Sequence, residues 1–274
     1  MFSRRVIGEH TMTAGQAGTP VDTSRPHPAR VYDYLLGGKD HYPVDQALGE
    51  QMPELAKVGV AQNRAFMHRA ADWAARAGID QFLDIGTGIP TRPNLHQIVQ
   101  EVNPAARIVY TDNDPIVLRH AEALLVSTPE GATDYLQADV RDPEKILARA
   151  RTVLDFERPV ALSMIALMHF LADEDDPYGI TRTLLGALPA GSALVLSHFT
   201  KDFLSAEQDK TDEYRASGIT LRPRSRAEVS RFFDGLDLVG PGVVTAPQWH
   251  CGTPAPERRE TTDSFHVGVG RVRA

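Results

Sequence analysis

Three aspartates at the ends of successive apolar runs are the residues best placed to do chemistry. Asp84 closes one short run, Asp112 closes the next 28 residues later, and Asp139 follows the third. A carboxylate at such a point can accept hydrogen bonds from a ligand: an amino group at Asp84, ribose hydroxyls at Asp112, an adenine amine at Asp139. Each could instead serve only a turn or a helix cap, but three together are much more specific than one.

A glycine turn, Gly86-Thr87-Gly88, follows Asp84 and indicates what kind of ligand would fit. Glycine permits a positive φ and lets the backbone approach a ligand closely. A dinucleotide site would need a third glycine, where Thr91 stands, and Pro90 delays the next helix. Asp84 would also repel a phosphate. The turn therefore favours a ligand with an amino group and no phosphate over NAD.

Two Asp-Pro pairs predict where the following helices begin. Asp114-Pro115 and Asp142-Pro143 each have the N-cap and first-turn residues of a helix. If Asp114 and Asp142 cap these helices, the carboxylates of Asp112 and Asp139 are left free for a ligand.

The elements that must position these residues alternate between strand and helix patterns. Strands are predicted at 81–85, 107–110, 135–137, 160–167, 193–197, 236–239 and 265–272, and helices at 62–77, 94–102, from 115, from 143, at 180–188 and near 206–216. Strands separated by single helices predict a mostly parallel sheet with right-handed crossovers. Ligands of such sheets bind at the carboxyl ends of the strands, where the three aspartates lie.

Composition narrows the class of protein. The 274 residues are 42% apolar and 24% charged, and the net charge of −7 argues against nucleic acid as the main partner. Cys251, the single cysteine, cannot form an internal disulfide, and no apolar run is long enough to cross a membrane. We expect a cytoplasmic protein with a disordered tail at 1–25 and one domain at 26–274.

The chain from about Pro28 to Val272 resembles the class I S-adenosylmethionine-dependent methyltransferases. More narrowly, it is similar to a bacterial family of S-adenosyl methyltransferases with no assigned substrate. The matching segments are ARVYDYLLGGKD (29–40), NRAF (63–66), QFLDIGTGIPT (81–91), YTDNDP (110–115) and GSALVLSH (191–198). Two positions depart from the patterns: Pro90 replaces the third glycine of the general class, and His41 stands where the narrower family usually has Asn.

The resemblance implies an α/β, Rossmann-like, doubly wound sheet of seven mostly parallel strands, with strand 265–272 antiparallel and a helical or loop cover at the N-terminus. It implies S-adenosylmethionine as cofactor. Asp84, Gly86 and Gly88 would surround its methionine moiety, Asp112 its ribose, and Asp139 with Val140 its adenine. The remaining residues assigned to this site are Thr87, Asn113, Ala166, Tyr34 and Arg64.

The segment 26–60 is expected to cover the cofactor. Tyr34 or Tyr32 could contact the ligand, or these tyrosines could only attach the segment to the core. Arg64 could meet the methionine carboxylate, or it could form a surface ion pair. Gly37-Gly38-Lys39 has neither the spacing nor the preceding strand of a phosphate loop.

His169 and His198 follow the fourth and fifth predicted strands and are the candidate general bases, since histidine titrates near neutral pH. Either could equally be a packing or capping residue. No cluster has the spacing of a metal site. The polar segment 201–224 is expected to form a lid over an acceptor.

The sequence thus predicts a methyltransferase acting on an unidentified small molecule, with no nucleic acid or membrane partner and an undetermined oligomeric state. Two alternatives stay open: a module that binds S-adenosylmethionine without turnover and, less favoured, an NAD-dependent oxidoreductase.

Overall fold

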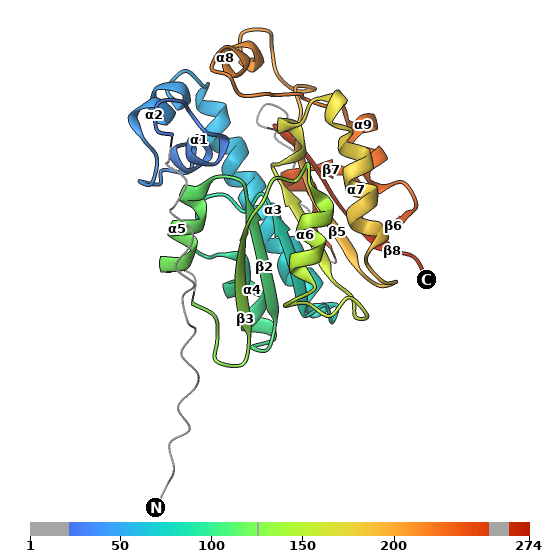
Figure 1. Ribbon diagram of the computed structural model, residues 1–274. Helices are drawn as coiled ribbons and strands as arrows, with labels where there is room; N and C mark the ends of the chain where they lie inside the picture. Colours follow the sequence, from blue (N-terminus) through green and yellow to red (C-terminus); the bar gives the residue numbers. More distant parts are fainter. Residues whose placement is uncertain (1–21, 125, 252–262) are drawn as a thin grey trace, which may run out of the picture.

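The computed structural model describes residues 22–124, 126–251 and 263–274 (Figure 1). Of the tail predicted at 1–25, residues 1–21 lie outside the described part, and residues 22–25 are exposed. No helix in the described part is both long and apolar enough to span a bilayer.

One mixed sheet forms the centre of the molecule. Its strand order is β3-β2-β1-β4-β5-β8-β6, with β7 also pairing with β8. The first five strands run parallel, and β8 is antiparallel to β5, β6 and β7. The predicted fold class, including the antiparallel last strand, is confirmed. The bounds are β1 Gln81–Ile85, β2 Arg107–Asp112, β3 Ala132–Gln137, β4 Ala161–Ile165, β5 Ala193–Phe199, β6 Leu236–Leu238, β7 Val244–Thr245 and β8 Phe265–Val272.

Helices cover both faces of this sheet (Figure 1). One buried cluster joins α3 and α4 to one face, and a second joins α6 and α7 to the other. The strands β1 and β4 are buried along nearly their whole length for this reason. The bounds are α1 Pro28–Leu35, α2 Pro43–Gly49, α3 Glu54–Arg76, α4 Leu95–Val102, α5 Pro115–Leu124, α6 Pro143–Ala150, α7 Pro177–Gly186, α8 Thr211–Ala216 and α9 Arg226–Ser230, with short 3-10 turns η1 Met168–Phe170, η2 Asp173–Asp175, η3 Arg231–Phe233 and η4 Ala246–Gln248.

Several elements differ in length from the sequence prediction. The helix predicted at 62–77 begins at Glu54, although Gly59 and the β-branched Val58 and Val60 disfavour a helix. Packing overrides propensity here, because Val60 is buried in a small core and Gly59 passes close to Ser264. Strand β7 is only two residues long, too short to give a pattern. The helix predicted near 206–216 covers only Thr211–Ala216.

The N-terminal cover is the segment from Pro28 to Gly49 together with the first turns of α3. Its small core contains Val31, Leu35, Leu48 and Val60. Ile219, from the segment 201–224, is buried in the same core. The cover and the segment 201–224 therefore pack on each other above the carboxyl ends of the strands (Figure 1).

A buried arginine attaches the cover to the sheet edge. Arg30 of α1 forms ion pairs with Asp114, through Nε at 3.2 Å, and with Asp45, through Nη1 at 3.5 Å. All three side chains are buried. Asp45 also accepts the backbone N–H groups of His27 and Tyr42, so it holds the starts of α1 and α2 beside this arginine.

Replacing this arginine should be strongly destabilising. In Arg30→Met two buried carboxylates lose their cation, and we expect the free energy of unfolding to fall by about 3–5 kcal/mol. Urea unfolding measures it, with Arg25→Met, at an exposed position, as the control. Equal stability of the two variants would contradict the role given to Arg30.

Candidate active site

A cavity of about 1240 Å³, measured out to its open mouth, lies at the carboxyl ends of the strands beneath α1. We call it the first cavity. It brings together all but one of the residues predicted for the cofactor: Arg64, Asp84, Gly86, Thr87, Gly88, Asp112, Asn113, Asp139, Val140 and Ala166.

The glycine turn shapes one wall of the first cavity. Gly86 and Gly88 have φ values of 74° and 67°, which disfavour any other residue. A Cβ at Gly86 would come within 2.7 Å of Leu167, whereas one at Gly88 would meet nothing nearer than Ala29 at 4.0 Å. Gly86 is thus needed for packing, while Gly88 leaves room beside the backbone. Thr87 closes the turn by donating from Oγ1 to the Asp84 carbonyl.

Asp112 is less free than the sequence suggested. Asp114 does cap α5, by accepting from the Ile116 amide at 2.9 Å. However, the Asp112 carboxylate itself accepts from the amides of Gly88, at 2.8 Å, and Asp114, at 2.9 Å. Burial raises the pKa of Asp112, and these two N–H groups act in the opposite direction. Each carboxylate oxygen still has a lone pair that a ribose hydroxyl could use.

Asp84 and Arg64 place opposite charges in the same cavity. Burial raises the pKa of Asp84 and lowers that of Arg64. The Arg64 Nη2 donates to the carbonyls of Thr91 and Pro93, but its Nε is buried without a hydrogen-bond partner. Neither residue forms an ion pair within the described residues. Arg64 lies in the middle of α3 and lines the first cavity. It does not form the surface ion pair that was the alternative interpretation of its role.

Asp139 is held by its neighbours at the far end of the first cavity. Its carboxylate accepts from the backbone and the guanidinium of Arg141, and from Nδ2 of Asn113 at 3.3 Å. Asp142 caps α6, as predicted. The Val140 amide has no hydrogen-bond partner within the described residues, so it can donate to a ring nitrogen.

Ala166 closes β4 in an unusual conformation. Its φ of 52° is rare for a residue with a Cβ, and such outliers concentrate at functional sites. Its amide donates to Ser197 Oγ at 2.9 Å. The turn places Leu167 over Gly86.

Tyr34 is the predicted cofactor residue that the structure does not bring to the first cavity. Its ring packs on Gly49 and lies edge-on to His41, which in turn contacts the Asp33 carboxylate. Tyr34 therefore packs within the cover, against its small core. Its neighbour Tyr32 reaches the cavity instead, because the two side chains point to different sides of α1.

A second cavity, of about 720 Å³ including its mouth, lies between the cover and the segment 201–224. Its lining is mainly apolar and includes Met52, Ala56, Leu204 and Leu221. Pro28, Tyr32 and Phe170 line both cavities, so the two meet at these side chains.

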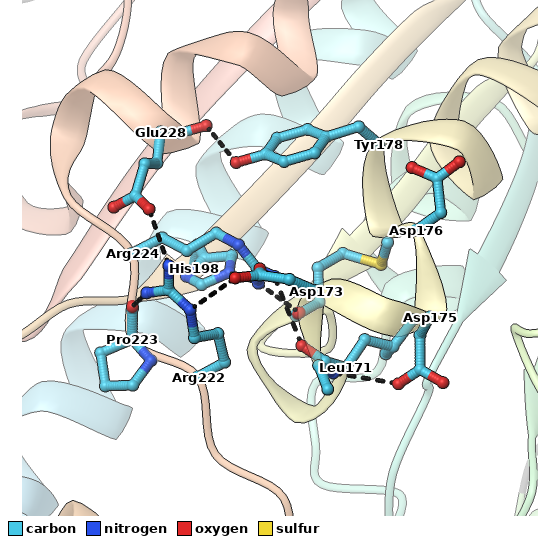
Figure 2. A network of polar contacts seen from close by, with 12 residues as sticks. Leu171, Asp173, Asp175, Asp176, Tyr178, His198, Arg222, Pro223, Arg224 and Glu228 are labelled. Atoms are coloured by element: carbon cyan, nitrogen blue, oxygen red, sulfur yellow. Dashed lines mark hydrogen bonds and ion pairs between the residues drawn. The ribbon is translucent and has the colours of Figure 1, made fainter.

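His198, one of the two candidate bases, reaches neither cavity. Its side chain is completely buried, Nδ1 donates to the Phe199 carbonyl, and Nε2 accepts from Arg224 at 3.0 Å. Figure 2 shows Arg224 between His198 and Asp173. With both ring nitrogens engaged, His198 cannot remove a proton from a substrate, and its prediction as a general base is wrong.

Arg224 and Arg222 hold the end of the segment 201–224 against the loop that follows β4 (Figure 2). Arg224 donates to the carbonyl of Met168 and pairs with Asp173 at 2.7 Å. The Arg222 amide donates to the His169 carbonyl at 2.7 Å. These contacts fix η1, which carries His169, the other candidate base. His169 is nearly buried and lines the second cavity.

Comparison with known proteins decides the family. A family model described as S-adenosyl methyltransferase matches residues 14–273, nearly the whole chain. The chain belongs to this family. It is therefore an S-adenosylmethionine-dependent methyltransferase, which confirms the predicted cofactor and enzyme class and decides against the nicotinamide alternative.

Solved structures agree with this assignment. A DUF574 family protein from Streptomyces avermitilis is 47% identical, with a TM-score of 0.88, over 92% of this chain and 100% of that one. A protein from Thermobifida fusca is 38% identical, with a TM-score of 0.81, over 92% of this chain and 97% of that one. The plantazolicin methyltransferase BpumL is 10% identical, with a TM-score of 0.52, over 89% and 96%, which shows the shared fold alone. No curated protein matches.

The first cavity of the methyltransferase fits S-adenosylmethionine chemically. A buried Nε on Arg64 without a partner suits a carboxylate, and the unpaired acid Asp84 suits an ammonium group. Open space beside Gly88 leaves room for a ligand against the backbone. Within the described residues, no group of three or more His, Cys, Asp or Glu side chains could hold a metal ion.

Sequence reasoning missed other residues of the methyltransferase site. Arg141 and Leu167 line the first cavity. They directly follow Val140 and Ala166, two predicted site residues, and this position in the sequence could have identified them. His27 also lines it and pairs with Asp114, but nothing in its local sequence indicates this.

Acid should destabilise the methyltransferase through His198. Burial lowers the pKa of His198 from 6.5 to about 3. The unfolded chain therefore takes up this proton near pH 6.5, and the native protein only near pH 3. The free energy of unfolding should fall as pH falls through this window, by about 1.4 kcal/mol per pH unit from this group.

Urea unfolding of the wild type and of His198→Gln between about pH 4 and pH 7 measures this effect. Gln cannot take up the proton, so the stability advantage of the wild type should shrink as the pH falls. A difference that stays constant over the range would contradict the prediction.

Proposed function

We propose that this methyltransferase transfers the methyl group of S-adenosylmethionine from the first cavity to a small-molecule acceptor in the second. The observation that carries the proposal is that the two cavities meet at Tyr32, Pro28 and Phe170. Methyl transfer is an in-line displacement, so an acceptor held directly beside the donor supplies most of what the reaction needs. The lining of the second cavity is mainly apolar with a few polar side chains, as is typical of sites that bind small molecules.

The residues of the first cavity take separate roles in this proposal. Arg64 binds the methionine carboxylate and Asp84 its ammonium group, while Gly86, Thr87 and Gly88 form the backbone against which this end lies. Ala166 closes the wall beside Leu167. When bound, S-adenosylmethionine supplies an electrophilic methyl group on a sulfonium.

The nucleoside end is bound by the next two strand ends. Asp112 accepts the ribose hydroxyls with the lone pairs that its backbone contacts leave free, and Asn113 lies beside it. The Val140 amide donates to a ring nitrogen of adenine. Asp139 accepts from the adenine amine while Arg141 fixes its carboxylate.

The alternative, a protein that binds S-adenosylmethionine without turning it over, predicts no space for an acceptor. The second cavity is the observation against it.

Removing the Arg64 cation should weaken cofactor binding. Charge-assisted hydrogen bonds contribute about 1.5–3 kcal/mol, so Arg64→Met should bind S-adenosylhomocysteine roughly 10- to 100-fold more weakly than the wild type. Isothermal titration measures this, with the exposed Arg92→Met as matched control. Unchanged affinity in Arg64→Met, or no binding to the wild type, would overturn the assignment.

Blocking the second cavity should abolish methylation without affecting the cofactor. Ala56 and Ala61 both lie on α3, but Ala56 lines the second cavity and Ala61 is exposed. With methyl-labelled S-adenosylmethionine and a Streptomyces avermitilis extract, label should enter the low-molecular-mass fraction with wild type and Ala61→Phe, but not with Ala56→Phe.

All three proteins should bind S-adenosylhomocysteine equally. Label that enters the macromolecular fraction instead would contradict a small-molecule acceptor.

A further inference from the structure

The polar groups of the second cavity limit which acceptors it can bind; this inference rests on the proposed function. No carboxylate lines the cavity within the described residues, and its ionisable side chains are Tyr32, His169, Lys210 and Tyr214. Lys210 is already paired with Glu213 at 2.9 Å. The cavity therefore has nothing to neutralise a cationic acceptor, whose burial there would be costly.

The two tyrosines do not act as bases. Tyr32 donates to the Val60 carbonyl at 3.1 Å and accepts from Asn63 Nδ2 at 3.0 Å, so its hydroxyl is fully engaged. Burial raises the pKa of both Tyr32 and Tyr214. Both therefore remain neutral phenols. Gln208, Thr211 and Ser264 are further uncharged polar side chains of the lining, and His169 is the group whose hydrogen-bonding state the structure defines.

A backbone contact determines which ring nitrogen of His169 carries the proton. The Phe199 amide lies 3.1 Å from His169 Nδ1. A backbone N–H can only donate, so Nδ1 must be the unprotonated nitrogen, and the neutral ring carries its hydrogen on Nε2. Nε2 has no hydrogen-bond partner within the described residues. The bonds from Arg222 and Arg224 to η1 hold the backbone beneath this ring.

The charged and titratable groups around His169 maintain the neutral ring. His198 of β5 lies edge-on to it, and Arg224 approaches from the end of the segment 201–224. Burial, with smaller contributions from His198 and Arg224, holds the pKa of His169 well below its ordinary value. Lys210 and the two neutral tyrosines are the other ionisable groups of the cavity.

We propose that the second cavity binds an uncharged or anionic acceptor with an apolar body, and that the Nε2–H of His169 donates a hydrogen bond to an oxygen of this acceptor. His169 thus orients the acceptor and does not remove a proton from it, which corrects its prediction as a general base. The acceptor must attack with a lone pair that it already carries. As the new bond to the methyl carbon forms, the bond to sulfur breaks. An anionic acceptor thereby becomes neutral without any proton moving, and an uncharged acceptor takes up the positive charge of the sulfonium and then releases the proton on its methylated atom to solvent.

The first test is the protonation state of His169 in the protein saturated with S-adenosylhomocysteine. In the wild type labelled with ¹⁵N-histidine, the long-range ¹H–¹⁵N spectrum should show Nε2 protonated and Nδ1 unprotonated, without titration between about pH 5 and 8. Loss of the signals in His169→Gln assigns them. A proton on Nδ1, or titration near pH 6.5, would overturn the proposal.

The second test uses probes that differ only in hydrogen bonding. Acetophenone carries a carbonyl acceptor, and α-methylstyrene has a CH₂ group in its place. One hydrogen bond predicts about 3- to 10-fold tighter binding of acetophenone to the saturated wild type. Benzylamine, a cation at neutral pH, should bind more weakly than either.

Two variants connect this preference to His169. His169→Gln keeps an amide donor near the Nε2 position, so it should still bind acetophenone more tightly than α-methylstyrene. His169→Phe has no donor there, so it should bind the two probes equally. Thermal unfolding of both variants checks that they fold, and the ¹⁵N spectrum of the wild type is independent of them. Equal binding of the two neutral probes, or no binding of acetophenone, would overturn the proposal.

The outcomes separate this proposal from the proposed function. Failure of S-adenosylhomocysteine to bind the wild type would contradict the cofactor site itself. Normal binding of S-adenosylhomocysteine with the wrong tautomer or no probe preference would contradict only the role given to His169.

Discussion

The buried pairing of Arg30 with Asp114 is the contact on which the rest of the site depends. A parallel sheet brings its strand ends to one edge, but that edge is open until something covers it. Arg30 holds α1 over this edge by its ion pair with Asp114, which lies two residues after Asp112, the last residue of β2. Because α1 lines both cavities, this one pair supports the walls of each. Because the pair is buried, separating the two side chains would leave an uncompensated buried charge, and this cost holds α1 firmly in place.

The polar residues of the site share a common arrangement. Each uses part of its hydrogen-bonding capacity to fix its own position and leaves the rest for a ligand. Asp112 accepts two backbone amides, Arg64 donates to two carbonyls, and His169 accepts one amide. Such groups are oriented before a ligand arrives, so little ordering remains to be done on binding.

The sequence predicted the sheet and the edge where the first cavity lies, because buried parallel strands and Asp-Pro helix starts are local signals. It could not reveal what depends on distant contacts. His198 looked like a base because it follows a strand, but Arg224, 26 residues later, takes its free nitrogen. The role of Tyr34 depended on which side of α1 faces the sheet, and the start of α3 depended on a core shared with Ile219. Local periodicity carries no information about such partners.

Tyr32 gives the two cavities a common wall, with a thermodynamic consequence. Its ring borders both, and its hydroxyl is tied to Val60 and Asn63 of α3. A molecule in one cavity that shifts or rigidifies Tyr32 alters the lining that a molecule in the other cavity meets. By linkage, any resulting change in affinity is reciprocal: whatever factor the donor imposes on the acceptor, the acceptor imposes on the donor. A single aromatic ring can in this way make the binding of two substrates cooperative.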